Sequence, residues 1–366
     1  MTAFTSPTGT ETSLPPGFRP KRRLGFNTRV SFSDDSGPAQ GLRDGIELFK
    51  AAEAAGYQSG WVYQRHFDHY LSSPVPFLTA VGQHTERISL GSAVLPMRYQ
   101  DPILLAESAG VADLLVDERL ELALATGANA AWDAVFGAVA TDARTEARRR
   151  LVQFLDAVAG TTLHTVDGPG QGAPVGTELR VTPHSPTLRS RLRQGSSSIG
   201  SALQAAELGI GLIVGTVLHD IPPGETYSQY QGRVIETYRT AWREQQGGEP
   251  PSVAVAASVL PGTTPELRER YAGYDLQRRT EGMAASRPKG ALQPVVSADL
   301  PQGMQISPVF HGTPEQVTEA VLADPGLAQA DELVLFLPPA FTLSDNVRLV
   351  RDLAETVAPA LGWVAA

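Results

Sequence analysis

The sequence predicts a single (β/α)8 TIM barrel of the α/β class, with insertions after the fourth and seventh strands. Short apolar runs that alternate with helical patterns of about 10–15 residues are typical of parallel sheets. Between Gly56 and Gly127 this strand-turn-helix unit occurs three times in succession. Along the whole chain it occurs eight times, which favours one barrel over two doubly wound domains.

Local signals place the individual elements. Gly56 marks the stop of the first helix, Asp101 followed by Pro102 is typical of a helix start, and Thr313 to Gln316 has capping-box spacing. The expected strands are residues 23–30, 58–65, 88–95, 119–125, 188–195, 209–215, 252–260 and 332–337. The expected helices are residues 41–55, 73–85, 101–116, 141–159, 198–208, 227–245, one that begins at 313, and 344–357.

Three segments fall outside this regular pattern. Residues 1–20 are polar and proline-rich and predict a disordered N-terminal tail before the barrel of residues 21–366. Residues 160–187 are rich in Gly, Pro and Thr, and they predict an excursion that holds a weak strand pair. Residues 262–311 predict a lid-like insertion, because long segments with little structure inside a compact domain usually bind or cover ligands.

Composition excludes several classes of protein. The net charge of −9 disfavours nucleic acid and anionic membranes as partners, which call for clustered Lys and Arg. No run approaches the ~18 apolar residues of a membrane span. The absence of cysteine excludes disulfides and thiolate metal sites and suits a cytoplasmic location. The first twenty residues lack the features of a secretory signal, so we expect a soluble cytoplasmic protein.

The fifth predicted strand ends in a serine turn, residues 194–201, directly before a helix. Hydroxyl groups and free N–H groups at a helix N-terminus suit a phosphate, and Arg193 and Thr126-Gly127 could close around the same anion. The alternative is an ordinary serine N-cap.

Other strand ends carry polar or small residues. Arg65 to His69 follow the second strand, where His66, Asp68 and His69 allow two interpretations, a metal site or ordinary rim residues; no second cluster supplies further ligands. Gly91 to Pro96 places small residues where a flat ligand could lie. The nucleotide, hydrolase-elbow and zinc motifs are absent.

At these same residues the chain resembles the bacterial luciferase-like family of flavin-dependent monooxygenases and oxidoreductases. The matching pieces are residues 54–67, 71–74, 85–96, 101–107, 113–127, 196–209 and 310–317. The resemblance implies a barrel that binds reduced FMN, or in a sister branch F420, over its mouth. It also implies a homodimer through the second and third helices. By position it implies cofactor contacts for Phe26, Ala93, Val94, Thr126, Gly127, Ser197, Ser198 and Ser201, with a non-prolyl cis peptide often at Ala93-Val94, and no metal.

The chain departs from the luciferases at the expected catalytic positions, Arg65 and His66. Gln64-Arg65-His66-Phe67 stands where luciferases have Glu-His-His-Phe, so Arg65 replaces the acid/base histidine, and Thr126 replaces a phosphate-site arginine. Light emission is not expected. We hypothesise that Arg65 stabilises an anionic flavin or a peroxide through fixed positive charge.

Four functions remain open at this point. The first is a two-component monooxygenase in which FMN, supplied by a flavin reductase, does the redox chemistry on a small organic substrate. The second is an F420-dependent oxidoreductase, the third a flavin-binding homologue with little catalysis, and the fourth a flavin-free barrel acting on a phosphorylated metabolite. No motif in residues 128–140 or 262–311 indicates a substrate class.

Overall fold

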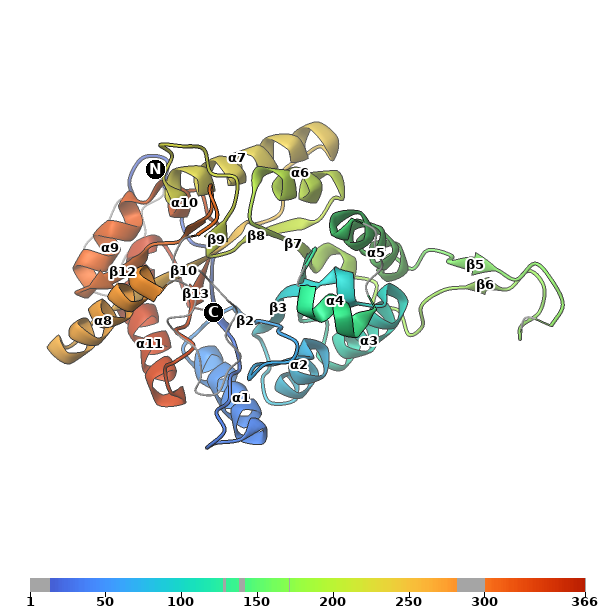
Figure 1. The fold of residues 1–366 in the computed structure, drawn as a ribbon, viewed down its shortest axis with the longest axis horizontal. Helices are drawn as coiled ribbons and strands as arrows, with labels where there is room; N and C mark the ends of the chain where they lie inside the picture. The colour runs from blue at the N-terminus through green and yellow to red at the C-terminus, as the bar shows by residue number, and fades with distance from the viewer. Residues whose placement is uncertain (1–13, 128–129, 138–141, 171, 282–299, 366) are drawn as a thin grey trace.

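The computed structural model describes residues 14–127, 130–137, 142–170, 172–281 and 300–365. Eight parallel strands form a closed barrel, with β8 hydrogen-bonded to β10 to complete the ring. Helices surround the strands (Figure 1), which confirms the predicted fold class. In order around the barrel the strands are β10 (Ala254–Pro261), β13 (Glu332–Phe336), β1 (Arg23–Thr28), β2 (Ser59–Val62), β3 (Ser89–Pro96), β4 (Leu120–Ala125), β7 (Leu192–Ser196) and β8 (Gly211–Val214).

The helices begin largely where the local signals place them. Asp101 caps its helix by accepting hydrogen bonds from the N–H groups of Ile103 and Leu104, and Thr313 forms a capping box with Gln316. The helices are α1 (Pro38–Ala54), α2 (Pro74–Gly82), α3 (Pro102–Leu115), α4 (Ala130–Phe136), α5 (Ala143–Val158), α6 (Ile199–Glu207), α7 (Tyr227–Gln245), α8 (Pro265–Glu281), α9 (Pro314–Ala323), α10 (Pro325–Ala328) and α11 (Leu343–Thr356). Short 3₁₀ turns cover Met97–Tyr99, Leu188–Arg191 and Ala358–Leu361.

Trp61 fills the middle of the barrel. It is fully buried and packs with Ile213, Ala256 and Val334 in a cluster separate from the larger core between strands and helices. Gly91 makes room for it, since a β-carbon there would lie 2.3 Å from the Trp61 ring. One large side chain opposite a glycine closes the barrel centre, so any ligand must bind above it, at the carboxyl ends of the strands.

Below Trp61 the barrel holds a buried ionic network. Arg193 contacts Glu121 at 3.1 Å and Glu332 at 3.4 Å, and Arg23 contacts the same two carboxylates at 2.7 and 3.5 Å. Trp61 donates to the Ser59 hydroxyl, which in turn donates to Glu332. The expectation that Arg193 helps to bind a phosphate is therefore wrong, because its side chain points into the barrel toward two carboxylates.

Several predicted boundaries differ from the structure. β7 begins at Leu192 because the preceding turn is held by Arg191, which pairs with Asp113 at 2.8 Å. The predicted tail is too long, since Phe18 is buried and Arg19 pairs with Asp331 at 2.8 Å; residues 1–13 lie outside the described residues.

The excursion and the segment after β10 both contain regular structure. β5 (His164–Thr165) and β6 (Glu178–Leu179) form the predicted antiparallel pair, which projects away from the barrel (Figure 1). After β10 come α8, β11 (Gln305–Ile306) and β12 (Val309–Gly312). β11 pairs antiparallel with β9 (Val217–Leu218), and β12 pairs parallel with the carboxyl half of β10. Residues 282–299 of the predicted lid lie outside the described residues.

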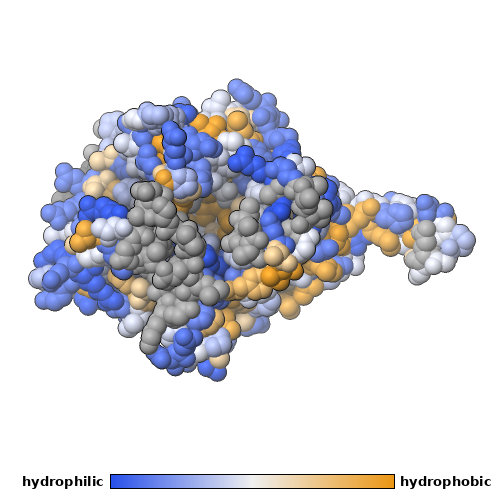
Figure 2. Space-filling view, viewed as in Figure 1, coloured by the Kyte–Doolittle hydropathy of each residue, from blue (hydrophilic) through white to orange (hydrophobic). Residues whose placement is uncertain are grey.

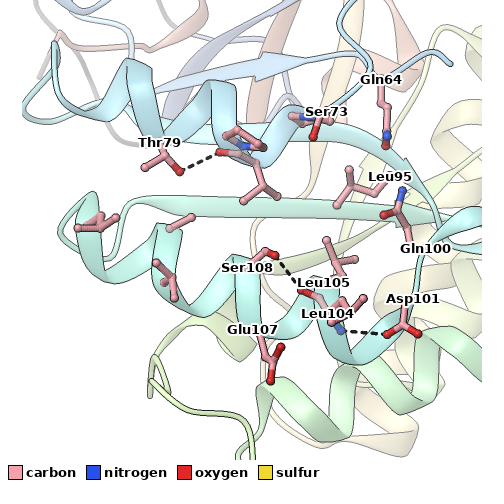
Figure 3. A pocket seen from close by; sticks show the side chains of 16 residues that line it. Gln64, Ser73, Thr79, Leu95, Gln100, Asp101, Leu104, Leu105, Glu107 and Ser108 are labelled. Atoms are coloured by element: carbon pink, nitrogen blue, oxygen red, sulfur yellow. Dashed lines mark hydrogen bonds between the residues drawn. The ribbon is translucent and has the colours of Figure 1, made fainter. Parts of the chain in front are cut away.

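An apolar groove of about 670 Å³ runs between α2 and α3 (Figure 3). Its lining includes Leu104, Val111 and Leu115, whose side chains are exposed. Figure 2 shows apolar atoms gathered over this α3 edge of the molecule. Among the helices in the described part of the chain, none is long and apolar enough to cross a membrane.

Candidate functional site

A cavity of about 280 Å³ opens at the carboxyl ends of the barrel strands. Residues from nearly every strand or from the loop that follows it line this cavity, and Trp61 and its neighbours close it below. The lining comprises Asn27, Arg29, Tyr63, Ala93, Val94, Ala125, Gly195, Ser196, Ser197, Ile213, Gly215, Thr216, Val217, Ala256 and Phe336. This is the end of a (β/α)8 barrel where ligand sites occur.

The serine turn forms one side of the cavity. Ser196 and Ser197 line it, and Ser198 is the N-cap of α6 through its contact with the N–H of Ser201. The Ser201 hydroxyl accepts from the N–H groups of Ser197 and Ser198 at 3.2 and 3.1 Å. The turn is therefore an ordinary serine N-cap, and it also lines the cavity. The Ser201 hydroxyl stabilises this turn from within.

The third strand supplies the flat part of the lining. Ala93 and Val94 face the cavity, and the peptide bond between them is cis, as the resemblance implies. The ladder between β3 and β4 shifts register between Ala93 and Leu95. Gly195 lies opposite, where a β-carbon would come within 2.2 Å of Val94 Cγ1. The absence of side-chain atoms at Gly195 therefore keeps this part of the cavity open.

The lining residues that sequence reasoning did not predict include Asn27, Arg29, Tyr63 and Phe336. They lie at or just after the ends of β1, β2 and β13. The period of two along a strand could have found Asn27, because alternate residues face opposite sides. Phe26, its neighbour, points outward instead and packs edge-on against Phe49 with 4.8 Å between ring centres. This packing removes Phe26 from the candidate site.

Arg65 and His66 lie on the rim and do not line the cavity. Arg65 Nε is 2.7 Å from an Asp68 carboxylate oxygen, so its charge is already balanced. His66 is half-buried, and burial lowers the pKa of its imidazole below the usual 6.5. His69 Nε2 lies 3.7 Å from Asp34. The described residues include no group of three His, Cys, Asp or Glu side chains that could hold a metal ion.

Aromatic rings from two elements surround His66. Its ring centre is 5.2 Å from that of Trp132, 4.9 Å from that of Phe136 and 6.1 Å from that of Tyr99. We call His66, Tyr99, Trp132 and Phe136 the aromatic cluster. It brings α4 against the end of β3 and partly shields the His66 ring from water, which explains the direction of its pKa shift.

Thr126 and Gly127 follow β4 beside the cavity without lining it. The Thr126 carbonyl accepts from the N–H of Arg98 at 3.1 Å. Gly127 has a φ of +63°, and a β-carbon there would lie 2.2 Å from Pro96 Cβ. Glycine is favoured at such a positive φ. Residues 128–129, which follow, are outside the described residues. A cofactor contact by Thr126 and Gly127 stays a prediction.

A family model and a relative of known sequence each match most of the chain. A model of luciferase-like monooxygenases matches residues 23–328. The uncharacterized protein YwcH of Bacillus subtilis (strain 168) is 26% identical over 349 residues, which are 89% of this chain and 96% of that protein.

Two solved structures show the shared fold. The oxygenating constituent of 3,6-diketocamphane monooxygenase from Pseudomonas putida, in complex with FMN, is similar with a TM-score of 0.69 and 16% identity, over 93% of this chain and 98% of that one. The F420-dependent tetrahydromethanopterin reductase from Methanopyrus kandleri is similar with a TM-score of 0.60 and 14% identity, over 93% of this chain and 99% of that one.

Proposed function

Because the chain belongs to the luciferase-like monooxygenase family, we propose that it is the oxygenating component of a two-component monooxygenase. It would receive reduced FMN from a separate flavin reductase and act with O₂ on a small organic substrate. The likeness to the oxygenating constituent of 3,6-diketocamphane monooxygenase, which was solved in complex with FMN, supports this proposal. The observation that carries it is one cavity at the barrel mouth, lined by the serine turn and, beside that turn, by the small residues of β3 and Gly195.

The residues of the cavity fit the parts of FMN. Ser197, beside the N-terminus of α6, offers a hydroxyl and a positive dipole end for the phosphate. Ala93, Val94 and Gly195 leave a surface without long side chains, on which a planar ring can lie. When bound, reduced FMN supplies the electrons that activate O₂. The protein's own part is to hold the ring in one orientation and to keep water out.

The aromatic cluster suits this second task. Trp132 and Phe136 cover the β2 rim, and His66 among them is neutral at neutral pH because burial lowers its pKa. A neutral imidazole can accept a proton, so His66 remains the better of the two predicted catalytic residues. Arg65 is the weaker one, because Asp68 already neutralises it.

An F420-dependent oxidoreductase is the second candidate, supported by the likeness to the tetrahydromethanopterin reductase. A flavin-binding homologue with little catalysis is the third, supported by the altered Gln64-Arg65 pair. Purified protein titrated in parallel with FMN, riboflavin and F420 separates them by fluorescence quenching. We expect FMN to bind more tightly than riboflavin, since only FMN carries a phosphate for the serine turn.

A matched pair of variants sharpens this test. Ser197→Ala should weaken FMN binding and leave riboflavin binding unchanged, whereas Ser190→Ala, an exposed serine before β7, should change neither. Equal affinity for FMN and riboflavin would contradict the phosphate site. Tight binding of F420 alone would favour the second candidate. FMN binding without O₂ consumption on supply of reduced FMN would favour the third.

We also propose that the protein is a homodimer through the groove between α2 and α3. The groove in Figure 3 is apolar, and Leu104 and Leu115, which line it, are 62% and 57% exposed. An exposed apolar patch of this kind marks a protein interaction site. We propose a second copy of the chain as the occupant, because a twofold axis would bring the same groove of two copies together.

A further inference from the structure

The cavity has two poles of different chemistry. The strand order around the barrel places β1 four strands from β7, which is diametrically opposite in a ring of eight. Arg29, which follows β1, and Ser197, which follows β7, both line the cavity. A ligand whose anionic tail lies at the serine turn therefore extends toward Arg29.

The charge of Arg29 has no balancing partner among the described residues. No hydrogen bond or ion pair joins its guanidinium to any of them, and its Nε is buried without an acceptor. Arg65, on the neighbouring rim, differs in charge balance and not in the hydrogen bonding of its Nε, because it forms an ion pair with Asp68 at 2.7 Å. A buried donor without an acceptor is costly, so an unpaired Nε at a cavity wall is a donor that a ligand can satisfy.

Aromatic rings hold Arg29 at the wall. Its Cζ lies 5.1 Å from the ring centre of Tyr63, 5.5 Å from that of Tyr70 and 5.6 Å from that of Phe336. Ring faces attract a guanidinium and orient it without neutralising it. The planar fork of donors is thus fixed in direction before any ligand arrives, which reduces the entropy lost on binding.

A second cation lies on the same side of the barrel. Arg278 of α8 has its Cζ 5.7 Å from the Phe336 ring centre and donates to the hydroxyls of Ser258 and Ser307 at 2.6 and 3.2 Å. Phe336 lines the cavity and has both guanidinium groups close to it. Two guanidinium groups therefore lie near one ring on the β13–β1 side of the mouth.

We propose that Arg29, aided by Arg278, is an oxyanion-binding pole opposite the serine turn. It takes a planar delocalised anion that presents oxygen to the guanidinium fork. Two sources share this chemistry: the N1–C2=O edge of reduced FMN, and a carboxylate on the organic substrate. The first source rests on the flavin site proposed above. The second requires only the cavity.

Four proteins test the proposal: wild type, Arg29→Met, Arg29→Lys, and Arg22→Met as the matched control. Arg22 is an exposed arginine just before the amino end of the strand that Arg29 follows. The first arm measures affinity for oxidised and for anaerobically reduced FMN. The second arm measures affinity for benzoate and for its neutral analogue benzamide, by calorimetry with and without oxidised FMN.

We expect Arg29→Met to bind either reduced FMN or benzoate about 10- to 100-fold more weakly than wild type. A loss of this size corresponds to one charge-assisted hydrogen bond. Arg29→Lys should lose less, because the charge remains without the fork. Arg22→Met should match wild type. A loss confined to reduced FMN identifies the cofactor ring as the source, and a loss confined to benzoate identifies a substrate carboxylate.

The proposal is overturned if Arg29→Met lowers the affinities for oxidised and reduced FMN equally and changes the affinities for benzoate and benzamide by the same factor. Arg29 would then serve packing alone. It is equally overturned if no affinity changes, or if Arg22→Met loses as much as Arg29→Met. Wild-type protein that binds no flavin at all would contradict the proposed function. The benzoate arm on flavin-free protein would still decide the role of Arg29.

Discussion

Arg98 and Asp133 form a two-pronged ion pair between the 3₁₀ turn after β3 and helix α4. Arg98 Nε lies 2.7 Å from Oδ1 of Asp133 and its Nη2 lies 3.1 Å from Oδ2. The Tyr99 hydroxyl donates to the same Oδ1 at 2.9 Å. These contacts join α4, and with it Trp132 and Phe136, to the rim of the cavity. The hydrogen bond from Arg98 lowers the pKa of the Asp133 carboxyl.

Breaking this pair should release α4 from the rim. We expect Asp133→Asn to raise amide hydrogen exchange in α4 by about tenfold and to shift Trp132 fluorescence toward that of exposed tryptophan, because the charge-assisted contact is lost. Arg243→Met is the control. It removes an exposed arginine of α7 that pairs with Glu249, beyond the end of that helix. Unchanged exchange in Asp133→Asn would show that the aromatic contacts alone hold α4.

His66 should titrate below the value of free histidine. Burial lowers its pKa in the folded protein, while the unfolded chain keeps a value of about 6.5. Between the two values the unfolded chain binds more protons, so the free energy of unfolding falls as pH drops through 6.5 toward the folded pKa. NMR titration of the His66 ring measures the midpoint, and His66→Phe should abolish that part of the pH dependence. A midpoint above 6.5 would refute the burial argument.

Filling the space at Gly195 should close the flat part of the cavity. The new β-carbon of Gly195→Ala would lie 2.2 Å from Val94 Cγ1, so the Val94 side chain must move into the cavity or the strand must shift. We expect about tenfold weaker FMN binding, of the size of an overpacking penalty. Val94→Ala combined with Gly195→Ala should restore binding. Gly200→Ala, whose β-carbon would meet no atom closer than 3.8 Å, is the control.

Arg193 should be essential for stability and have no direct role in ligand binding. Its removal leaves Glu121 and Glu332 buried with Arg23 alone, so Arg193→Met should lower the free energy of unfolding by about 3–5 kcal/mol. Urea unfolding measures this loss. Adding Glu121→Met should cost less than the sum of the two single changes, because it removes the excess negative charge and leaves Arg23 paired with Glu332. Additive losses would mean that the two side chains do not interact.

Charge in the groove between α2 and α3 should separate the proposed dimer. Replacing both Leu104 and Leu115 with Asp removes two exposed leucines from the interface and places like charges across a twofold axis. We expect the dimer dissociation constant to rise by more than about a hundredfold. Light scattering should then give half the wild-type mass. Leu203→Asp, at an exposed leucine on α6, should leave the mass unchanged. A wild-type protein that is monomeric in solution would contradict the proposed dimer.

The sequence by itself determined the order and type of the barrel strands and of the main helices between them, whereas α4, α10, β9, β11 and β12 were not predicted. Asp101 with Pro102, Thr313 with Gln316, and the apolar runs act over a few residues, and the helices and barrel strands form where these signals stand. The serine turn was predictable for the same reason, since Ser198 caps its helix through Ser201, only three residues away. Local hydrogen bonding and strand period decide such features without the rest of the fold.

Only the tertiary structure decided which side chains meet in the cavity. Phe26 and Asn27 are adjacent, yet closure of the barrel turns Asn27 inward and Phe26 toward α1. Arg193 finds Glu332, 139 residues away, whereas Arg29 meets aromatic rings and no described carboxylate. The physical reason is that electrostatic partners of buried charges come from distant strands, and their identity depends on register and on which face each strand presents.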